Sequence, residues 1–444
     1  MRRTHRRQLL KSVAAAAIGV QIVPAFVLGG PGKKSPSEKL NIAGIGIGGQ
    51  GASDLKEMAG ENIVALCDCD WTKAGGTFKS YPKAQKFKDY RLMLDQIGKE
   101  IDAIMVATPD HMHAPIALHY MRAQKHAYVE KPMAHTIEEA RLMTKVAKEM
   151  GVVTQMGNNG HAGEGLRLTR EWLDAGAIGV VKEIHCWSDR PGKFWKQDLD
   201  RPAETPPVPA NLEWDLFLGA APERPYHPVY HPRAWRGWFD YGTGALGDMA
   251  VHNMDPAFYA LDLGAPIAAE AQTSPIRKES YPAWQIIKYE FAAKGNRPAV
   301  NMTWYDGGKM PEVPAHVKGE YELKDNGILF IGDKGTMVCG GWSGPPAIFP
   351  GSLRKDFAKP APTIARSPLG HRGEWIQACK DSKPQDAKAG FDYSGPFTEA
   401  LLVGNLAVRL QKRVEWDSAN MKCTNLPEPE GLVKKTYRKG FGIS

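Results

Sequence analysis

The sequence has few cysteines and no recognisable pattern among them. Its six cysteines include no C-x-x-C pair and no spacing typical of a zinc finger, so we expect them to be small core residues rather than disulfides or metal ligands. No segment repeats along the chain. The formal net charge is only +8, and the first thirty residues, with five cations and no acid, supply five of these charges. These features argue against a disulfide scaffold and a repeat array, and they give no support for nucleic-acid binding.

Long hydrophobic runs are also scarce. One alanine-rich, modestly apolar run at 12–28 follows Arg6-Arg7, and it is short for a membrane span. This arrangement resembles a twin-arginine export signal, whose substrates cross the membrane folded. A membrane anchor and a basic amphipathic helix are the alternatives, and the short run without an aromatic belt disfavours both. We therefore predict a signal peptide at 1–30, cleaved between Ala25 and Pro31. We also predict a periplasmic or otherwise exported chain without stable membrane insertion, and the twin-arginine machinery as a partner.

The rest of the chain has the composition of a globular protein with two domains. Its 444 residues, 43% of them hydrophobic, can form two cores. After a linker at 31–38, residues 39–157 alternate apolar strands with amphipathic helices, which predicts an α/β domain with a parallel sheet covered on both faces. In 158–444 the strands alternate apolar and polar residues instead. This pattern predicts an α+β domain with an open, mostly antiparallel sheet and helices on one side.

Hydrophobic periodicity predicts the individual elements. We expect helices at 90–97, 113–124, 136–150, 163–175, 370–380 and 397–411, the third opening with a Thr-x-x-Glu capping box. We expect strands at 42–45, 101–107, 126–129, 152–155, 180–187, 268–273, 285–291, 299–304, 328–331 and 335–338. The proline-rich segments 201–209 and 345–362 are expected to be surface loops.

A glycine-rich turn between the first strand and the first helix organises the first domain. The sequence GIGGQG at 46–51 follows the apolar strand directly and fits G-x-G-x-x-G, and Asp68 ends the second strand 22 residues after Gly46. In this context the motif predicts a Rossmann dinucleotide-binding turn rather than an ordinary one, with a pyrophosphate at the helix N-terminus. Asp68 can accept hydrogen bonds from a ribose diol and would repel a 2′-phosphate, so we expect NAD rather than NADP. The predicted contacts are Gly46, Gly48, Gly49, Gln50, Gly51 and Asp68.

Three further motifs stand at expected ligand-binding positions. The sequences TPDHMH at 108–113 and EKP at 130–132 follow two predicted parallel strands, whose carboxyl ends are where ligands bind. A glycine-rich segment at 242–252 holds an aspartate and a histidine four residues apart. Each motif alone is compatible with a turn or a solvated loop. Together with the fingerprint, and in this order, they resemble the Gfo/Idh/MocA family, the glucose-fructose oxidoreductase and inositol dehydrogenase group.

The resemblance implies a catalytic site and further cofactor contacts. It places Lys131 beside the nicotinamide and the reacting carbon, with Asp248 and His252 completing the site. It places several other residues near the cofactor, namely Thr108, Pro109, Asp110, His113 and Glu130. Pairing through the open sheet is common in this family, so a homo-oligomer is also expected by resemblance.

The residues Asp248 and His252 suit acid-base chemistry on their own account. Four residues apart on a helix, they share one face, and Asp255 continues that face. A carboxylate can orient the imidazole, and a histidine can take a hydroxyl proton as hydride leaves and return it in the reverse step. A helix cap and a buried His–Asp hydrogen bond are the structural alternatives.

The substrate side departs from the better-known dehydrogenases of this group. After the last strand of the first domain, QMGNNGH at 155–161 stands where many of them carry an arginine. Asn158 can reach the nicotinamide amide or a sugar hydroxyl. Aromatic faces with scattered donors suit a sugar ring, although a loop packed over the sheet is the alternative for each. We expect substrate contacts from Asn158, His161, Arg190, Trp235, Arg236 and Tyr241. A metal site through His227, His231, Asp240 and Asp248 matches no zinc-site spacing, so no metal is predicted.

These features together predict an NAD-dependent oxidoreductase that oxidises a ring hydroxyl of a sugar or glycoside to a keto-sugar, with carbon 3 as a candidate position. The alternative is a glycosidase in which tightly bound NAD is regenerated through oxidation, elimination, hydration and reduction. A third alternative is a non-catalytic sugar-binding or structural relative, and the intact Lys131, Asp248 and His252 argue against it. Free NAD is scarce outside the cytoplasm, so the export signal favours tight retention of the nucleotide.

Overall fold

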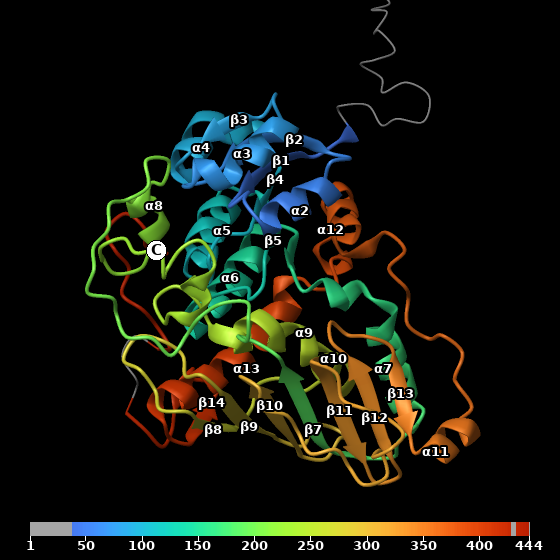
Figure 1. Cartoon of the computed structure of the whole chain (residues 1–444). Helices are drawn as coiled ribbons and strands as arrows, with labels where there is room; N and C mark the ends of the chain where they lie inside the picture. The colour runs from blue at the N-terminus through green and yellow to red at the C-terminus, as the bar shows by residue number, and fades with distance from the viewer. Residues whose placement is uncertain (1–37, 428–431, 444) are drawn as a thin grey trace, which may run out of the picture. The chain divides into compact units, whose positions relative to one another are not determined.

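The structure, a computed structural model, describes residues 38–427 and 432–443. The predicted signal peptide and all of the linker except residue 38 lie outside the described residues. From Asn41 onward the described chain forms one unit with two sheets (Figure 1).

The first sheet has six parallel strands in the order β3-β2-β1-β4-β5-β6, as the sequence predicts. The strands are β1 Asn41–Ile45, β2 Asn62–Cys67, β3 Gln85–Phe87, β4 Ala103–Val106, β5 His126–Val129 and β6 Thr154–Met156. Five helices accompany them, namely α2 Gln50–Glu57, α3 Trp71–Ser80, α4 Tyr90–Ile97, α5 His113–Arg122 and α6 Ile137–Met150. The strand order reverses between β1 and β4, and ligands of open parallel sheets bind outside the strand ends at such a reversal.

Local signals account for most of these elements. Apolar residues fill β4 and most of β1 and β5, and both faces of these central strands are buried. The helix α6 begins at the predicted capping box, in which Thr136 and Glu139 bond each other's backbone N–H groups. The sequence did not predict α3 or β3. Two glycines weaken the helical pattern of α3, and β3 is only three residues long.

The second sheet has nine strands in the order β13-β12-β11-β7-β10-β9-β8-β14-β15. All pairs are antiparallel except β10 with β7, so the predicted mostly antiparallel sheet is confirmed. The strands are β7 Val181–Ser188, β8 Ala268–Thr273, β9 Gln285–Phe291, β10 Val300–Asp306, β11 Asn326–Gly332, β12 Thr336–Gly340, β13 Pro346–Phe349, β14 Val414–Asp417 and β15 Lys422–Cys423.

Helices lie on the side of the second sheet that faces the first sheet (Figure 1). Those on or beside this side are α7 Glu164–Asp174, α9 Val251–Asn253, α10 Asp255–Leu261 and α13 Phe391–Leu410. The others are α8 Trp214–Leu218, α11 Gly351–Asp356 and α12 Gly370–Asp381. The long helix α13 is almost wholly buried and packs against both α6 and β8. It therefore joins the two parts of the fold into one core.

One predicted loop is wrong, and one predicted helix begins earlier than expected. The segment 345–362, expected to be a surface loop, contains β13 and α11. Helix α13 starts at Phe391, before the predicted 397, and includes Pro396. The proline lacks one N–H donor, but burial of the helix against α6 and β8 outweighs that loss. Proline alone is therefore a weak marker of a helix boundary in this chain.

Five of the six cysteines are buried and the sixth is partly buried, so the prediction that they are core residues is confirmed in most cases. No helix within 38–427 or 432–443 is long and apolar enough to cross a membrane. In the same ranges no group of three or more His, Cys, Asp or Glu side chains has the geometry to hold a metal ion.

Candidate functional site

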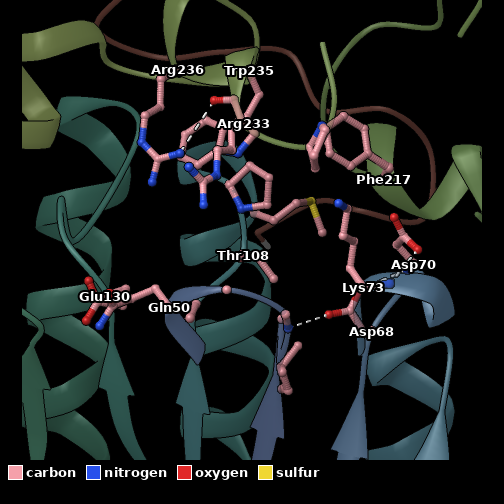
Figure 2. A pocket seen from close by; sticks show the side chains of 18 of the residues that line it. Gln50, Asp68, Asp70, Lys73, Thr108, Glu130, Phe217, Arg233, Trp235 and Arg236 are labelled. Carbon is pink, nitrogen blue, oxygen red and sulfur yellow. Dashed lines mark hydrogen bonds between the residues drawn. The ribbon is translucent and has the colours of Figure 1, made fainter. Parts of the chain in front are cut away.

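A cavity of about 830 Å³ lies at the carboxyl ends of the strands of the first sheet. The glycine-rich turn and the ends of β2, β4 and β5 form one side of it (Figure 2). Arg233, Trp235 and Arg236 lie on the opposite side in the same view. Residues of the second part of the chain therefore face the predicted nucleotide turn across a shared space.

The glycine-rich turn has the geometry that a pyrophosphate needs. Gly46 has a φ of 76°, and a Cβ there would lie 2.7 Å from the backbone of Ala107. A Cβ on Gly51 would lie 2.1 Å from the Gly46 carbonyl oxygen, so only glycine lets α2 pack this closely. At Gly49 a Cβ would meet nothing within 4 Å, which leaves open space at the start of α2. The turn therefore fits a dinucleotide, with the N-terminus of α2 beside it.

Asp68 has a structural role that the sequence did not predict. Its Oδ2 accepts hydrogen bonds from the backbone N–H of Ile47 at 2.9 Å and of Gly48 at 3.1 Å, and its Oδ1 accepts one from Asp70 at 2.9 Å. Burial raises the pKa of Asp68 to about 6, although these three donors oppose the shift. The carboxylate thus holds the glycine-rich turn to the end of β2. Asp68 also lines the cavity, and its contact with a ribose stays a prediction.

Lys131 and Asp248, predicted to be catalytic, form an ion pair in the cavity. The Lys131 Nζ donates to Oδ1 and to the main-chain oxygen of Asp248, each at 2.9 Å. Arg236 Nε donates to the same Oδ1 at 3.1 Å, and Arg190 Nε lies 3.8 Å from Oδ2. Burial by itself would raise the pKa of Asp248, but Lys131 and Arg236 outweigh it and hold this pKa well below its ordinary value. One carboxylate therefore gathers three cations at the cavity wall.

His252 lines the same cavity next to this cluster. It lies in α9, just after a π-helical turn at Leu246–Ala250 that carries Asp248. Its Nδ1 is buried and has no hydrogen-bond partner among the described residues. Burial, together with the charge of Lys131, lowers the pKa of His252 well below its ordinary value. The ring is therefore neutral at pH 7, and the same shift makes it a weaker base than a free imidazole.

The predicted orientation of His252 by a carboxylate is not what the structure shows. The carboxylate of Asp248 binds Lys131 and Arg236, and no hydrogen bond joins it to His252 in the described chain. A buried carboxylate–imidazole pair lies one turn further on. Asp255 receives His161 Nδ1 at 3.0 Å, the Tyr393 hydroxyl at 2.6 Å and the Asn158 amide at 3.2 Å.

Six of the predicted site residues do not line the cavity: Gly51, Asp110, His113, Asn158, His161 and Tyr241. Asn158 and His161 are buried around Asp255, as described above. Tyr241 is buried against the ring of His111, with 5.3 Å between centroids. The structure therefore does not place these side chains in direct contact with a ligand in this cavity.

Asp110 and His113 instead hold the loops of the site together. The Asp110 carboxylate accepts hydrogen bonds from the Thr243 N–H at 3.0 Å and hydroxyl at 2.6 Å. The His113 ring lies between the carbonyl oxygens of Thr108 and Pro132, at 2.9 and 2.7 Å. These contacts tie the 108–113 loop both to the segment that leads to Asp248 and to the loop that carries Lys131.

The remaining predicted residues do line the cavity: Gly46, Gly48, Gly49, Gln50, Thr108, Pro109, Glu130, Arg190, Trp235 and Arg236. Glu130 is buried, and its Oε1 has no hydrogen-bond partner within the described chain. Burial, reinforced by the charge of Asp54, raises the pKa of Glu130 above its ordinary value. Its carboxyl group is thus a further polar group facing the cavity.

Several cavity residues were not predicted from the sequence. They include Asp70, Lys73, Phe217, Arg233 and Phe441. Asp70 carried a detectable signal, because it follows Asp68 closely and caps the N-terminus of α3. Phe217 and Phe441 stand in no motif, and only the tertiary fold brings them to the cavity.

Two family models match this chain. One, described as the oxidoreductase family with an NAD-binding Rossmann fold, matches residues 39–158. The other, described as the C-terminal alpha/beta domain of that oxidoreductase family, matches residues 172–303. Together they cover more than half of the chain.

Curated relatives match over part of their length. Levoglucosan dehydrogenase of Pseudarthrobacter phenanthrenivorans is 28% identical over 174 residues, 38% of this chain and 35% of the relative. Inositol 2-dehydrogenase of Rubrobacter xylanophilus is 27% identical over 160 residues, 35% of this chain and 45% of the relative. A glycosyl hydrolase family 109 protein of Shewanella amazonensis is 32% identical over 157 residues, 31% of this chain and 34% of the relative. The chain thus spans less than half the length of these relatives.

Solved structures share the fold across most of the chain. The WlbA dehydrogenase from Bordetella pertussis, in complex with NADH and UDP-GlcNAcA, has a TM-score of 0.60 at 18% identity and covers 85% of this chain and 99% of that one. Levoglucosan dehydrogenase, in complex with NADH and levoglucosan, has a TM-score of 0.54 at 18% identity, with 85% and 99% covered. At this identity the likeness establishes the architecture of two sheets.

Proposed function

Because the chain belongs to the Gfo/Idh/MocA oxidoreductase family, with its NAD-binding Rossmann domain, we propose that it is an NAD-dependent enzyme that oxidises a ring hydroxyl of a sugar or glycoside to a ketone. One observation carries the proposal. The pair Lys131–Asp248 and the neutral His252 line the same cavity as the glycine-rich turn and Asp68. The dehydrogenases of levoglucosan and inositol among the relatives support a sugar or cyclitol as substrate.

The chain's own groups divide the chemistry between them. When bound, NAD supplies a hydride acceptor at the carbon that is oxidised. The neutral ring of His252, unprotonated at pH 7 because its pKa is lowered, is the group that accepts the hydroxyl proton. The Lys131 ammonium stabilises the oxygen as negative charge develops on it. The carboxylate of Asp248 holds the Lys131 ammonium in place, and Arg236 in turn donates a hydrogen bond to that carboxylate.

The substrate side suits a sugar ring. Arg190, Trp235 and Arg236 line the cavity next to the ion pair. The guanidinium of Arg236 lies 4.3 Å from the Trp235 ring centroid, so the two side chains form a joint donor and aromatic surface. Guanidinium groups donate to hydroxyls, and an indole face packs against the C–H side of a pyranose. Carbon 3 is the proposed position of oxidation.

A second candidate function has a specific observation in its favour. Several curated relatives are glycosyl hydrolase family 109 proteins, and one is an alpha-N-acetylgalactosaminidase. In the alternative glycosidase reaction, a ring hydroxyl is first oxidised to a ketone, which acidifies the neighbouring C–H bond. Loss of that proton expels the aglycone, water adds to the resulting double bond, and the ketone is reduced again. The same histidine and lysine would serve both reactions, so the residues alone do not separate them.

Product analysis distinguishes the two functions. Purified mature protein is incubated with methyl and aryl glycosides without added nucleotide, and the products are followed by NMR. A keto-glycoside that forms only up to the amount of bound or added acceptor identifies a dehydrogenase. Free sugar and aglycone that accumulate over many turnovers identify the glycosidase. If neither product forms from any glycoside or from inositol, the proposal of a catalytic function is wrong.

Export and assembly are proposed on the sequence and the family alone. We propose that a twin-arginine signal at 1–30 directs the chain out of the cytoplasm and that the mature chain forms a homo-oligomer. Replacing Arg6-Arg7 by Lys-Lys should block export in a fractionation assay, with a Lys11→Arg variant as control. Light scattering on the purified protein gives its mass, and a mass of one chain would contradict the oligomer.

A further inference from the structure

One end of the cavity is formed by residues that come from three distant parts of the sequence. Asp70 and Lys73 follow β2, and Lys88 and Asp89 follow β3. Phe217 and Phe441 face the same end from elsewhere in the chain. We call residues 209–219 the strap and residues 432–443 the tail. Neither belongs to the nucleotide-binding sheet, yet both contribute to the cavity wall.

The strap is attached to the backbone that follows β2. The N–H of Trp71 donates to the Asn211 oxygen at 3.0 Å, and the N–H of Glu213 donates to the Cys69 oxygen at 2.9 Å. These two bonds make an antiparallel bridge between Asp70 and Leu212. Glu213 also forms an ion pair with Lys88. The strap is thus paired, main chain to main chain, with the segment that begins immediately after Asp68.

The strap carries an aromatic side chain into the cavity. Phe217 is 4% exposed and stacks on Trp214, with centroids 4.9 Å apart and planes at 12°. Its ring also meets the ring of His231 at 4.9 Å, and His231 Nε2 lies 2.7 Å from the Asp70 carboxylate. Figure 2 shows Phe217 across the cavity from Asp70 and Lys73. The aromatic group is therefore held at the end of the cavity beyond Asp68.

The tail packs on the strap and closes the same end. Arg438 donates to the Gly219 oxygen at 2.9 Å and pairs with Asp215, and Arg91 donates to the Gly440 oxygen at 2.8 Å. Phe441 is 4% exposed, with the guanidinium groups of Arg91 and Arg438 4.3 and 4.9 Å from its ring centroid. Figure 1 shows the tail running beside α8, which lies within the strap.

These contacts point to a specific role. In a Rossmann domain, the ribose of the adenosine lies at the end of the second strand, and the adenine lies beyond it. We infer that the strap and the tail enclose the adenosine half of the dinucleotide, with Phe217 and Phe441 against the adenine end, and that the nucleotide stays bound between turnovers. The inference rests on the nucleotide binding of the proposed function. Release of the nucleotide requires the paired strap or the tail to detach.

A retained nucleotide restricts the reaction to redox-neutral cycles. The two electrons leave the carbinol C–H as hydride, and the hydroxyl proton goes to His252. The same hydride must then return to a carbonyl carbon, either of the processed sugar or of a second sugar, and the proton returns from His252. Net oxidation of a sugar therefore needs a second carbonyl compound as the acceptor.

The rate of nucleotide exchange tests the inference without using activity. The full-length mature protein is loaded with NAD, freed of unbound nucleotide, and chased with an excess of isotopically labelled NAD. Bound nucleotide is then released by acid at intervals and its label is measured by mass spectrometry. We expect unlabelled NAD to remain on the wild type for hours, and Phe217→Ala and Phe441→Ala to shorten its half-time at least tenfold.

Two further variants keep the result interpretable. Glu213→Gln removes only the partly exposed ion pair of the strap with Lys88, so it tests attachment of the strap if Phe217→Ala does not fold. Phe357→Ala truncates an aromatic residue that packs on Trp172 outside the cavity and should leave the half-time unchanged. Exchange of the wild type within a minute would overturn the inference. So would half-times within twofold of wild type in every folded strap and tail variant. Slow exchange without turnover of any sugar would instead overturn the proposed function and leave the inference standing.

Discussion

The Lys131→Met variant tests the proposed catalytic site most directly. Methionine keeps an unbranched stem of similar length and removes the ammonium, which makes two 2.9 Å hydrogen bonds to Asp248. A group that stabilises charge or moves a proton in the transition state contributes about 10²–10⁴-fold to the rate. We therefore expect turnover to fall by about that factor, equal to ~3–5 kcal/mol of activation free energy.

The cost of this substitution to folding should be smaller than the loss of a buried ion pair usually implies. Removing one partner of such a pair costs about 3–5 kcal/mol when the other charge is left alone. Asp248 keeps Arg236 at 3.1 Å and Arg190 at 3.8 Å, so its charge remains compensated. We expect the free energy of unfolding to fall by about 1.5–3 kcal/mol, the range for hydrogen bonds to charged groups.

Three measurements separate these effects. Turnover is measured on the glycoside identified by NMR, bound NAD by acid release, and stability by urea unfolding. Lys182→Met, at an exposed position on β7, is the matched control and should change none of the three. If Lys131→Met keeps its NAD and its fold and turns over within threefold of wild type, the catalytic assignment of Lys131 is refuted.

Three other substitutions have distinct expected results. His252→Ala should lower turnover by about 10²–10⁴-fold and leave the amount of bound NAD unchanged. The control His316→Ala, which lies outside the cavity, should keep wild-type turnover. Equal turnover in both variants would exclude His252 as the base. Asp68→Asn should weaken NAD binding by about tenfold or more, because an amide cannot accept all three backbone N–H bonds. Calorimetric titration with NAD and with NADP measures the two affinities. Unchanged affinities would contradict this prediction. Burial raises the pKa of Asp306 to about 7, so its contribution to stability is full below pH ~4 and is lost as the pH rises through 7. Wild type should therefore lose about 4 kcal/mol relative to Asp306→Asn over that range in urea unfolding, and parallel pH profiles would refute this.

Local patterns predicted the framework of the fold. Strands β5, β8 and β9 and helix α4 begin and end at the predicted residues. Their boundaries coincide with changes in hydrophobic periodicity, which the sequence shows directly. Lys131 and Asp248 are 117 positions apart, and the family resemblance implied that they share one site. The strand-end rule by itself concerned only Lys131, which follows a parallel strand.

Contacts between distant segments could not be predicted in the same way. An aspartate stands four residues before His252 in the sequence. Whether its carboxylate bonds the imidazole depends on which cations surround it. Three cations reach Asp248, and the next aspartate on that face, Asp255, binds a different imidazole, that of His161. Phe217 and Phe441 reach the cavity through main-chain pairing and tail docking, for which no local periodicity exists. Such contacts are decided by tertiary packing.

A short segment connects the two ends of the cavity. His231 binds the Asp70 carboxylate at the proposed nucleotide end, and five residues later Arg236 binds Asp248 at the proposed substrate end. Only four residues separate them, and the 3₁₀ turn Ala234–Gly237 carries Arg236 itself, so we expect a shift at one end to reach the other. If a sugar binds Trp235 and Arg236 as proposed, we expect it also to stabilise the wall over the nucleotide, and by linkage the nucleotide should strengthen sugar binding. Saturating sugar should slow NAD exchange in wild type by about fivefold or more, which corresponds to ~1 kcal/mol of coupling. In His231→Ala the contact to Asp70 is lost, so exchange should be faster and the effect of the sugar smaller. An equal effect of sugar in both proteins would show that the two ends move independently.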